Sequence, residues 1–178
     1  MGNATIMEFE GKKPEIHNSV KIFDSVNIIG DVSIDEDSSV WFGSVLRGDL
    51  NSIKIGKRTN IQDLAIIHTY QPDNAMFPNG IPVIVGDECT IGHRVTLHAC
   101  KIGNRCLIGM GSVVLDNVIV GDDCFITASS LLPKGKKYPP MSLISGNPAK
   151  VVRPLQAKEI EAIKKETEFY LELKKRYL

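Results

Sequence analysis

Aliphatic side chains recur every six residues through most of this chain. A count in steps of six from Ile16, restarted three times, meets only isoleucine, valine and leucine. A period of six matches neither the 3.6-residue repeat of a helix nor the two-residue alternation of a strand. It suits a coil of short parallel strands with three flat sides per turn, in which each hexad supplies one side and one inward residue. The repeat residues are Ile16, Ile22, Ile28, Ile34, Val40, Leu46, Ile55, Ile61, Ile67, Val85, Ile91, Leu97, Ile102, Ile108, Val114, Val120, Ile126 and Leu132.

The repeat resembles that of the hexapeptide-repeat proteins, whose coils form a left-handed parallel β-helix, an exception to the usual right-handed crossover. The resemblance implies an all-β domain of about six coils over residues 1–153. Residues 69–82 are rich in Pro, Asn and Gly, and we expect them to form a loop that bulges out of the coil. Glycine follows the repeat residue at positions 56, 86, 92, 103, 109 and 121, as expected where a chain turns a tight corner.

A second inward position lies four residues after the repeat residue and often holds a small or β-branched side chain. Three of the four cysteines fall on it, so we expect them to be reduced and buried as small hydrophobic residues. The remaining one, Cys100, lies beside a corner and is not assigned by this pattern. The second inward positions are Val20, Val26, Val32, Cys89, Val95, Cys106, Val118, Cys124 and Ser130.

After Pro154 the hydrophobic pattern changes to helical spacing. Residues 154–178 are predicted to form an amphipathic helix that packs along its own prism, because charges of both signs are interspersed on its polar side and do not favour a membrane surface. Trp41 and Phe42 are expected to contact this helix or another subunit. The apolar side of the helix consists of Ile160, Ile163, Thr167, Tyr170 and Leu171.

The composition excludes several functional classes. The chain has 178 residues, is 43% hydrophobic and has 21 acidic and 21 basic residues, which is typical of a soluble domain. A chain without net charge, and without a basic cluster outside the last helix, is not expected to bind nucleic acid. It has neither a run of about 18 apolar residues nor a signal-peptide pattern, so we expect no membrane span and a cytoplasmic location.

One side of the predicted coil carries a column of three outward polar residues, one from each of three consecutive coils. Each directly follows a repeat residue, and they are Arg47, His68 and His98. Neighbouring parallel strands lie about 4.8 Å apart, so His68 and His98 should be within reach of one metal ion.

His93 is the third residue of its hexad and lies on an adjacent side of the coil. Asp63 holds the equivalent place one coil earlier, and Gln62 precedes it. Since adjacent sides of a prism face different directions, His93 should not meet His68 and His98 within one chain. If three prisms pack around a common axis, however, a neighbouring subunit can supply it, and one three-histidine site forms at each interface. A lone outward histidine is usually only a surface residue; the set of three in two adjacent coils favours a metal site.

The segments that carry these residues are similar to those of the γ-class carbonic anhydrases. They are "RGDLNSIKIGKRTNIQD" from Arg47, "IIHTY" around His68 and "IGHRVTLHACKIGNRCLIGMGSVVLD" from Ile91. The resemblance implies a homotrimer with zinc, or else iron or cobalt, bound by His68 and His98 of one chain and His93 of its neighbour.

The resemblance also implies a reaction, the reversible hydration of CO2 to bicarbonate by a zinc-dependent lyase. In carbonic anhydrases the metal lowers the pKa of its bound water to about 7. Gln62 matches a residue that hydrogen-bonds this water. Arg47, Asp49 and Asp63 match polar residues around the site, where they serve either in catalysis or only in interface ion pairs.

The sequence departs from the family pattern at the proton-transfer step. Leu50 stands where a glutamate serves as the proton shuttle, and Ile144 stands where a tyrosine is common. Leucine cannot relay a proton, so Tyr70, Asp73 or buffer would have to carry it. We therefore expect metal binding together with hydration that is slow or absent.

Two other functions stay open. Many hexapeptide proteins are acyl-CoA-dependent acetyltransferases that bind the cofactor in the cleft between prisms and use one histidine as a general base. The segment "GNPAKVVR", residues 146–153, resembles one that is common among them. A catalytically silent trimeric binding or assembly protein would also keep the ligands and lose the shuttle. The three histidines with Gln62 and Asp63 favour the metal site, because a transferase needs only one histidine.

Overall fold

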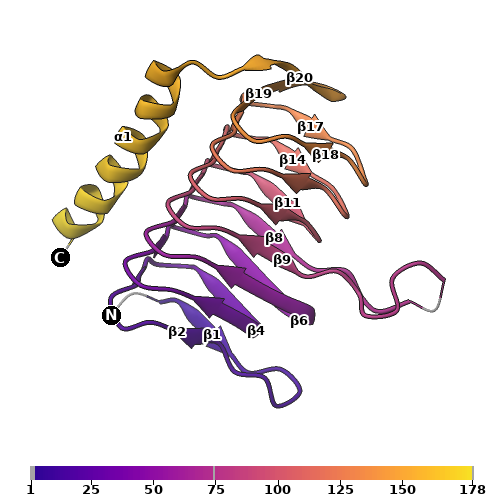
Figure 1. Ribbon diagram of the computed structural model, residues 1–178. Helices are drawn as coiled ribbons and strands as arrows, with labels where there is room; N and C mark the ends of the chain where they lie inside the picture. The colour runs from indigo at the N-terminus through magenta and orange to yellow at the C-terminus, as the bar shows by residue number, and fades with distance from the viewer. Residues whose placement is uncertain (1–2, 74, 178) are drawn as a thin grey trace.

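The computed structural model describes residues 3–73 and 75–177, which form a left-handed parallel β-helix with one C-terminal helix (Figure 1). This confirms the predicted fold. The helical elements are α1, Ala157–Leu173, and the short 3-10 helix η1, Lys174–Arg176. The strands are β1 (Thr5–Met7), β2 (Glu15–Ile16), β3 (Lys21–Ile22), β4 (Asn27–Ile34), β5 (Ser39–Val40), β6 (Val45–Ile55), β7 (Asn60–Ile61), β8 (Ile66–His68), β9 (Val83–Val85), β10 (Thr90–Ile91), β11 (Thr96–His98), β12 (Lys101–Ile102), β13 (Leu107–Ile108), β14 (Val113–Val114), β15 (Ile119–Val120), β16 (Phe125–Ile126), β17 (Leu131–Leu132), β18 (Lys137–Tyr138), β19 (Ser142–Gly146) and β20 (Ala149–Pro154).

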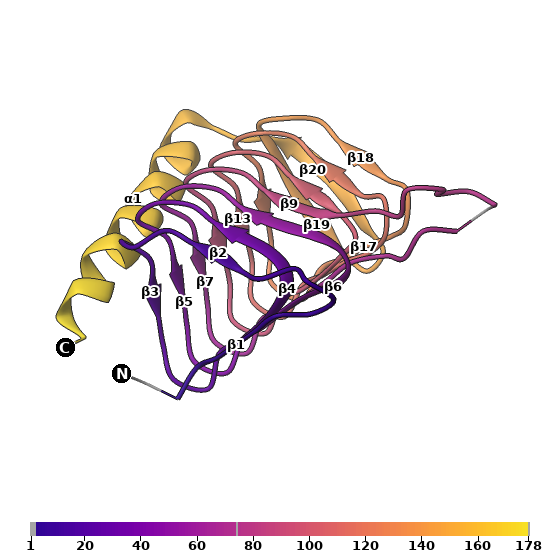
Figure 2. The same cartoon turned by 90° about the horizontal axis from the view of Figure 1, so that it is seen from below.

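The strands form the three sides of a prism but only two sheets (Figure 2). In the twelve-stranded sheet, the long strand β6 pairs with β8 near its start and with β9 near its end, so two sides of the prism belong to one sheet. We call the side that contains β8 and β11 the β8–β11 side. The eight-stranded sheet, in the order β20-β19-β16-β13-β10-β7-β5-β3, forms the third side. We call it the helix side, because α1 packs against it.

Strand pairing confirms the six-residue register. Leu46 pairs with Ile67, and Ile67 pairs with Leu97, as the count of hexads predicts. The repeat residues are all buried except Ile16 and Ile22 in the first coil, which are partly buried. Packing of branched side chains from successive coils therefore forms one continuous core along the axis.

The coil continues beyond the predicted repeat. Tyr138 pairs with Val120 and Ile144 pairs with Ile126, so both residues occupy repeat positions after Leu132. A tyrosine does not match the aliphatic pattern. It fits here because its ring closes the end of the prism and its hydroxyl donates a hydrogen bond to the carbonyl of Ala149 at 3.1 Å.

The glycines that follow repeat residues allow close contact between coils. Their backbone does not have the left-handed conformation expected at a tight corner. A Cβ atom on Gly109 would lie 2.4 Å from the backbone nitrogen of Ala128 and 2.7 Å from the carbonyl oxygen of Ile126 in the next coil. The left-handed corner positions are instead held by other residues, such as Leu64 at φ 59° and Arg94 at φ 58°. The expected role of these glycines is thus corrected.

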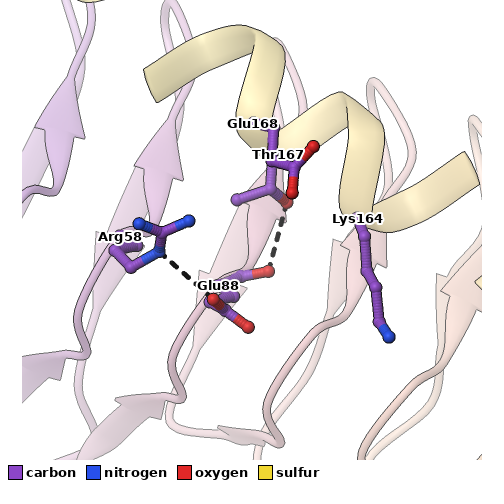
Figure 3. Close-up of a pocket in the computed structure, with 5 residues that line it drawn as sticks. All are labelled: Arg58, Glu88, Lys164, Thr167 and Glu168. Atoms are coloured by element: carbon purple, nitrogen blue, oxygen red, sulfur yellow. Dashed lines mark hydrogen bonds and ion pairs between the residues drawn. The ribbon is translucent and has the colours of Figure 1, made fainter. Parts of the chain in front are cut away.

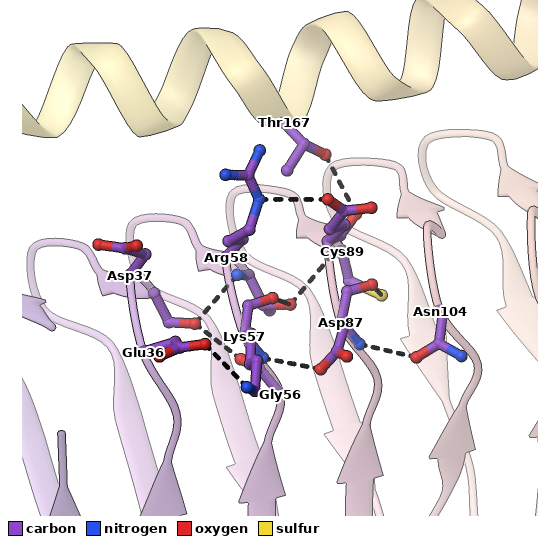
Figure 4. A network of polar contacts seen from close by, with 12 residues as sticks. Glu36, Asp37, Gly56, Lys57, Arg58, Asp87, Cys89, Asn104 and Thr167 are labelled. Atoms are coloured by element: carbon purple, nitrogen blue, oxygen red, sulfur yellow. Dashed lines mark hydrogen bonds and ion pairs between the residues drawn. The ribbon is translucent and has the colours of Figure 1, made fainter. Parts of the chain in front are cut away.

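A ladder of side-chain acceptors binds backbone N–H groups at one corner (Figure 4). The N–H of Lys57 donates to Asp87 Oδ1 at 2.8 Å, and the N–H of Asp87 donates to Asn104 Oδ1 at 2.9 Å. The N–H of Asn104 donates in turn to Asp122 Oδ1 at 2.9 Å. Each coil thereby satisfies donors of the coil before it, which a short strand alone would leave unpaired.

The predicted role of the cysteines is confirmed. All four are free and buried, and the thiol of Cys89 donates to the carbonyl of Gly103 in the next coil at 3.0 Å. Burial raises the pKa of Cys100, so this thiol is protonated at neutral pH. Buried, protonated thiols are structural and not nucleophilic.

Helix α1 lies along the helix side, and it begins at Ala157, three residues after β20 ends at Pro154. Of the predicted apolar side, Ile163 and Thr167 are buried, and Thr167 donates to the carbonyl of Glu88 at 3.2 Å. The ring of Trp41 packs against the helix, with its centroid 5.3 Å from that of Tyr170. No helix in the described residues is long and apolar enough to cross a membrane.

The loop 69–82, of which residues 69–73 and 75–82 are described, leaves the coil between β8 and β9, and these residues extend away from it, as predicted (Figure 1). Its ends are joined because Tyr70 and Ile81 exchange two backbone hydrogen bonds of 3.0 Å. In the loop, the carboxylate of Asp73 accepts the backbone N–H groups of residues 75–77 at 2.9, 2.6 and 3.0 Å. These bonds, those from Met76 and Phe77 above all, lower the pKa of Asp73. Asp73 is therefore a poor proton acceptor.

Candidate metal site

The predicted column of outward residues is present on the β8–β11 side. Arg47 pairs with His68, and His68 pairs with His98. The Nδ1 atom of His68 lies 3.2 Å from the Nε2 atom of His98. Two nitrogens bound to one tetrahedral zinc ion at about 2.0–2.1 Å lie about 3.3–3.4 Å apart. The two rings are therefore spaced as ligands of a single ion would be.

Each of these two rings also contacts a carboxylate through its other nitrogen. The Nε2 atom of His68 lies 3.0 Å from Asp49 Oδ1, and the Nδ1 atom of His98 is hydrogen-bonded to Asp116 Oδ1. A neutral imidazole has one N–H donor and one lone pair. When each N–H points to its carboxylate, the lone pairs of the two rings point toward each other. Metal-binding histidines commonly have such a carboxylate partner, so the residues present fit a metal ion.

The electrostatics of the pair suit metal binding at neutral pH. Burial lowers the pKa of His68, against the opposing effect of Asp49, so this imidazole is neutral near pH 7 and can ligate a cation. Burial by itself would raise the pKa of Asp49, but hydrogen bonds from Arg47 and His68 keep it below its ordinary value. The charged carboxylate of Asp49 is thus paired with the guanidinium of Arg47.

His93 belongs to the hexad that begins on the helix side, and it lies in the turn between β10 and β11. It follows β10 in the eight-stranded sheet, whereas β8 and β11 belong to the twelve-stranded sheet. Its Nδ1 atom lies 2.8 Å from Asp63 Oδ2, which leaves Nε2 free to bind a ligand. The prediction that His93 and the pair lie on different sides is confirmed. Within the part of the chain that the structure describes, no three His, Cys, Asp or Glu side chains group as ligands of one ion.

Gln62 is buried and is held at both ends of its amide. Its Oε1 atom accepts the backbone N–H of His93 at 3.1 Å, and its Nε2 atom donates to Asn60 Oδ1 at 3.2 Å. The amide keeps one N–H that these two bonds do not use. Gln62 therefore fixes the backbone at His93 and can still donate one hydrogen bond near its ring.

The surface around His93 is open and partly apolar. A hollow of about 510 Å³ is lined by Asp63, Leu64, His93, Arg94, Met110, Gly111 and Ser129. Leu64 and Met110 expose 50% and 56% of their surface, and the neighbouring Ile66 exposes 42%. Exposed apolar side chains that cluster in this way are typical of surfaces that contact another molecule.

A small cavity under α1 is a packing feature (Figure 3). It has a volume of about 60 Å³ and is lined by Arg58, Glu88, Lys164, Thr167 and Glu168. Arg58 pairs with Glu88 at 3.1 Å, and Thr167 donates to the Glu88 carbonyl. These contacts attach α1 to the prism, and the space is too small for an organic substrate.

The structure adds two residues that the sequence pattern did not single out, Asp116 and Lys134. Asp116 contacts His98, and the Nζ atom of Lys134 lies 3.8 Å from the other oxygen of Asp116. Both residues lie two positions after a repeat residue on the β8–β11 side. That shared offset was the signal available in the sequence.

Comparisons with known proteins show the family of this chain. The bacterial transferase hexapeptide family (six repeats) matches residues 99–134. A carbonic anhydrase of Geobacillus kaustophilus is 44% identical over 90% of this chain and 86% of its own length. The mitochondrial γ carbonic anhydrase 2 of Arabidopsis thaliana is 36% identical over 95% of this chain. This chain belongs to the γ-carbonic anhydrase-like family of hexapeptide-repeat proteins.

Other members of the γ-carbonic anhydrase-like family differ from this chain in length and in assigned activity. The chain spans 60% of the length of the Arabidopsis relative, which is named as mitochondrial. The solved structure of a Bacillus cereus protein, described as a candidate acetyltransferase, is 42% identical with a TM-score of 0.92, over 99% of this chain and 98% of that one. The cytoplasmic location and the reaction of the present protein therefore stay predictions.

Proposed function

We propose that this protein is a homotrimeric, metal-dependent enzyme that catalyses the reversible hydration of CO2 to bicarbonate. The observation that carries the proposal is the 3.2 Å approach of His68 Nδ1 to His98 Nε2, with the opposite nitrogen of each ring on a carboxylate. Membership in the γ-carbonic anhydrase-like family supports the same reaction. Zinc is the expected metal, with iron or cobalt as the alternatives.

The third ligand in this proposal is His93 of a neighbouring subunit. Its ring is oriented by Asp63 on a different side of the prism, so it serves the site of the next chain and not that of its own. The exposed Leu64, Ile66 and Met110 support a subunit contact at this place, because packing would remove their apolar surface from water. A closed ring of three chains gives three equivalent sites.

Gln62, Arg47 and Asp49 would have separate roles around the metal ion. When bound, the metal ion supplies the Lewis acidity that makes water a nucleophile near neutral pH, as in other carbonic anhydrases. Gln62 offers its unused amide N–H beside His93 to orient that water. The ion pair of Arg47 and Asp49 holds His68 in place and places fixed charge beside the site.

Proton transfer away from the site is expected to limit the turnover of the proposed enzyme. Leu50 exposes 40% of its surface in β6 and has no group that can take a proton. Asp73 is engaged by three backbone N–H groups. Tyr70 and buffer are then the remaining proton acceptors. Turnover should be slow, and where buffer takes the proton it should rise with buffer concentration.

Metal analysis together with stopped-flow CO2 hydration tests the proposal. Protein purified without chelators should contain about one zinc or iron ion per chain, and His93→Ala should remove it. His17→Ala is the matched control, because His17 is exposed in the first coil and its ring is hydrogen-bonded to the nearby Ser19, with its Nδ1 atom 2.9 Å from Ser19 Oγ. A His93→Ala protein that keeps its metal, or a metal-loaded wild type that fails to hydrate CO2 in concentrated buffer, would contradict the proposal.

An acyl-CoA-dependent acetyltransferase is the second candidate, favoured by the similarity to the Bacillus cereus structure. It would need only one of the three histidines as a base. Saturable binding of acetyl-CoA without CO2 hydration, measured on the same preparation, would favour it. A trimer that binds metal but shows neither activity would instead indicate an assembly protein.

A further inference from the structure

Asp116 lies outside the set of residues that the hexad pattern and the family resemblance point to. It follows β14, one coil beyond His98, and the Nδ1–H of His98 donates to its Oδ1 atom. The Asp116 side chain is only 19% exposed. Its second oxygen is 3.8 Å from the Nζ atom of Lys134 in the following coil.

We propose that Asp116 positions His98 for metal binding and that Lys134 couples this carboxylate to the loop 69–82. The inference rests on the proposed metal site, which it deepens. Neither residue is a ligand or touches the substrate in this scheme. Both act through His98, and the loop is thereby linked to the metal ion.

The contact with Asp116 sets the tautomer of His98. Because the Asp116 carboxylate accepts a hydrogen bond from Nδ1–H, the lone pair of the ring is on Nε2, the atom that faces His68 at 3.2 Å. Without that acceptor the ring can turn or carry its proton on Nε2, and either change removes a ligand atom from the pair. Carboxylates in this position typically contribute about 10–100-fold to metal affinity.

Lys134 also contacts the loop 69–82. Its Nζ atom lies 5.5 Å from the ring centroid of Tyr70 and 5.6 Å from that of Phe77, close enough for cation–π attraction to both. The two rings pack edge to face at 5.9 Å. Tyr70 is two residues after the ligand His68 along the chain. Lys134 therefore links Asp116, which contacts His98, to the loop that begins after His68.

The loop has a second attachment that does not involve Lys134. Asn51 donates through Nδ2 to the carbonyl of Asn79 at 2.8 Å. The base of the loop thus stays closed when Lys134 is changed, and only its aromatic pair loses a partner. A Lys134 variant should therefore alter the loop locally without unfolding it.

The test measures metal affinity in the trimer by competition with a chelator, using Zn²⁺ and Co²⁺, together with the visible absorption spectrum of the Co²⁺ form. Asp116→Ala should weaken binding by about 10–100-fold and change the Co²⁺ spectrum. Asp116→Asn, whose amide oxygen can still accept from His98, should show a smaller loss and preserve folding. Asp35→Asn, at an exposed position after β4 on the side of the prism that contains β9, is the matched control and should bind as wild type does.

Lys134→Ala and the double variant with Asp116→Ala complete a mutant cycle. Lys134→Ala alone should weaken metal binding less than Asp116→Ala does, and it should increase protease cleavage within residues 69–82. If Lys134 acts through Asp116, the double variant should lose no more affinity than Asp116→Ala alone. Additive losses would overturn the coupling.

The outcomes separate this inference from the proposed function. If wild type binds metal and both Asp116 variants bind it equally well with an unchanged Co²⁺ spectrum, the positioning role is wrong and the metal site stands. If wild type binds no metal, the proposed function itself fails. Should Asp116→Ala not assemble into trimers, the comparison of Asp116→Asn with Asp35→Asn decides the question.

Discussion

Subunit complementation gives the sharpest test of a site shared between chains. One variant, His93→Ala, keeps the pair of His68 and His98. A second variant, His68→Ala with His98→Ala, keeps only His93. Since the structure places the pair and His93 on different sides of one prism, neither variant alone can form a three-histidine site. A mixed trimer can, because the pair of one chain meets the His93 of another.

The size of the expected recovery follows from counting the junctions of a ring. Each junction joins the pair of one chain to His93 of the next, and the ring has a direction. A mixed trimer, in either proportion, then has one junction of the right kind among three. Mixed trimers purified through two different affinity tags should therefore hold about one-third of the wild-type metal content and CO2 hydration activity.

Metal content by mass spectrometry and hydration rate by stopped flow should recover together. Two differently tagged copies of His93→Ala, co-expressed and purified in the same way, form the control and should hold no metal. If mixed trimers hold no more metal than this control, the three ligands do not come from two subunits. Near-complete metal content in His93→Ala alone would show that His93 is not a ligand.

Three further predictions concern the core, the helix and the proton route. Ile108→Ala, at a fully buried repeat position, should lower the free energy of unfolding by about 2–5 kcal/mol in denaturant titration, and the partly buried Ile22→Ala should lower it less. Arg153, with the backbone of Gln156, holds the pKa of Glu159 at about 2, below its ordinary value of 4.5. The resulting stabilisation is present above about pH 4.5 and is lost as the pH falls toward 2. The melting temperature of Glu159→Gln should therefore be lower than that of wild type at pH 7, and the two should converge near pH 2. A difference in melting temperature that does not depend on pH would contradict this. Leu50→Glu should raise the hydration rate at low buffer concentration without changing metal content, and an unchanged rate would show that the missing glutamate does not limit turnover.

The arrangement of the coils could be predicted from the sequence because the interior of the prism is narrow. At the repeat position each side admits one branched aliphatic residue per coil, so the residue type at Leu46, Ile67 and Leu97 is almost independent of the rest of the chain. Where the prism ends, this restriction weakens. An aromatic ring is accepted at Tyr138, and the pattern of aliphatic residues no longer marks the repeat.

The site could be predicted only as far as the coil register determines it. The register placed His68 beside His98 and His93 on another side, because these statements depend on which strand follows which. The contact of Asp116 with His98 depends on side-chain direction across two coils. A one-dimensional repeat does not contain that information. The same holds for Gln62, whose amide is shown by the structure to hold the backbone of His93.

The carboxylate partners suggest how a site divided between subunits can bind a metal ion tightly. Asp49, Asp63 and Asp116 lie in different parts of the chain, yet each contacts one histidine within a single protomer. The rings are thus oriented when the protomer folds, before any interface forms. Assembly then has to bring two rigid surfaces together and does not have to order three flexible side chains, which reduces the entropic cost of binding the metal. On this reasoning, removal of the metal should leave the ring orientations in the trimer unchanged.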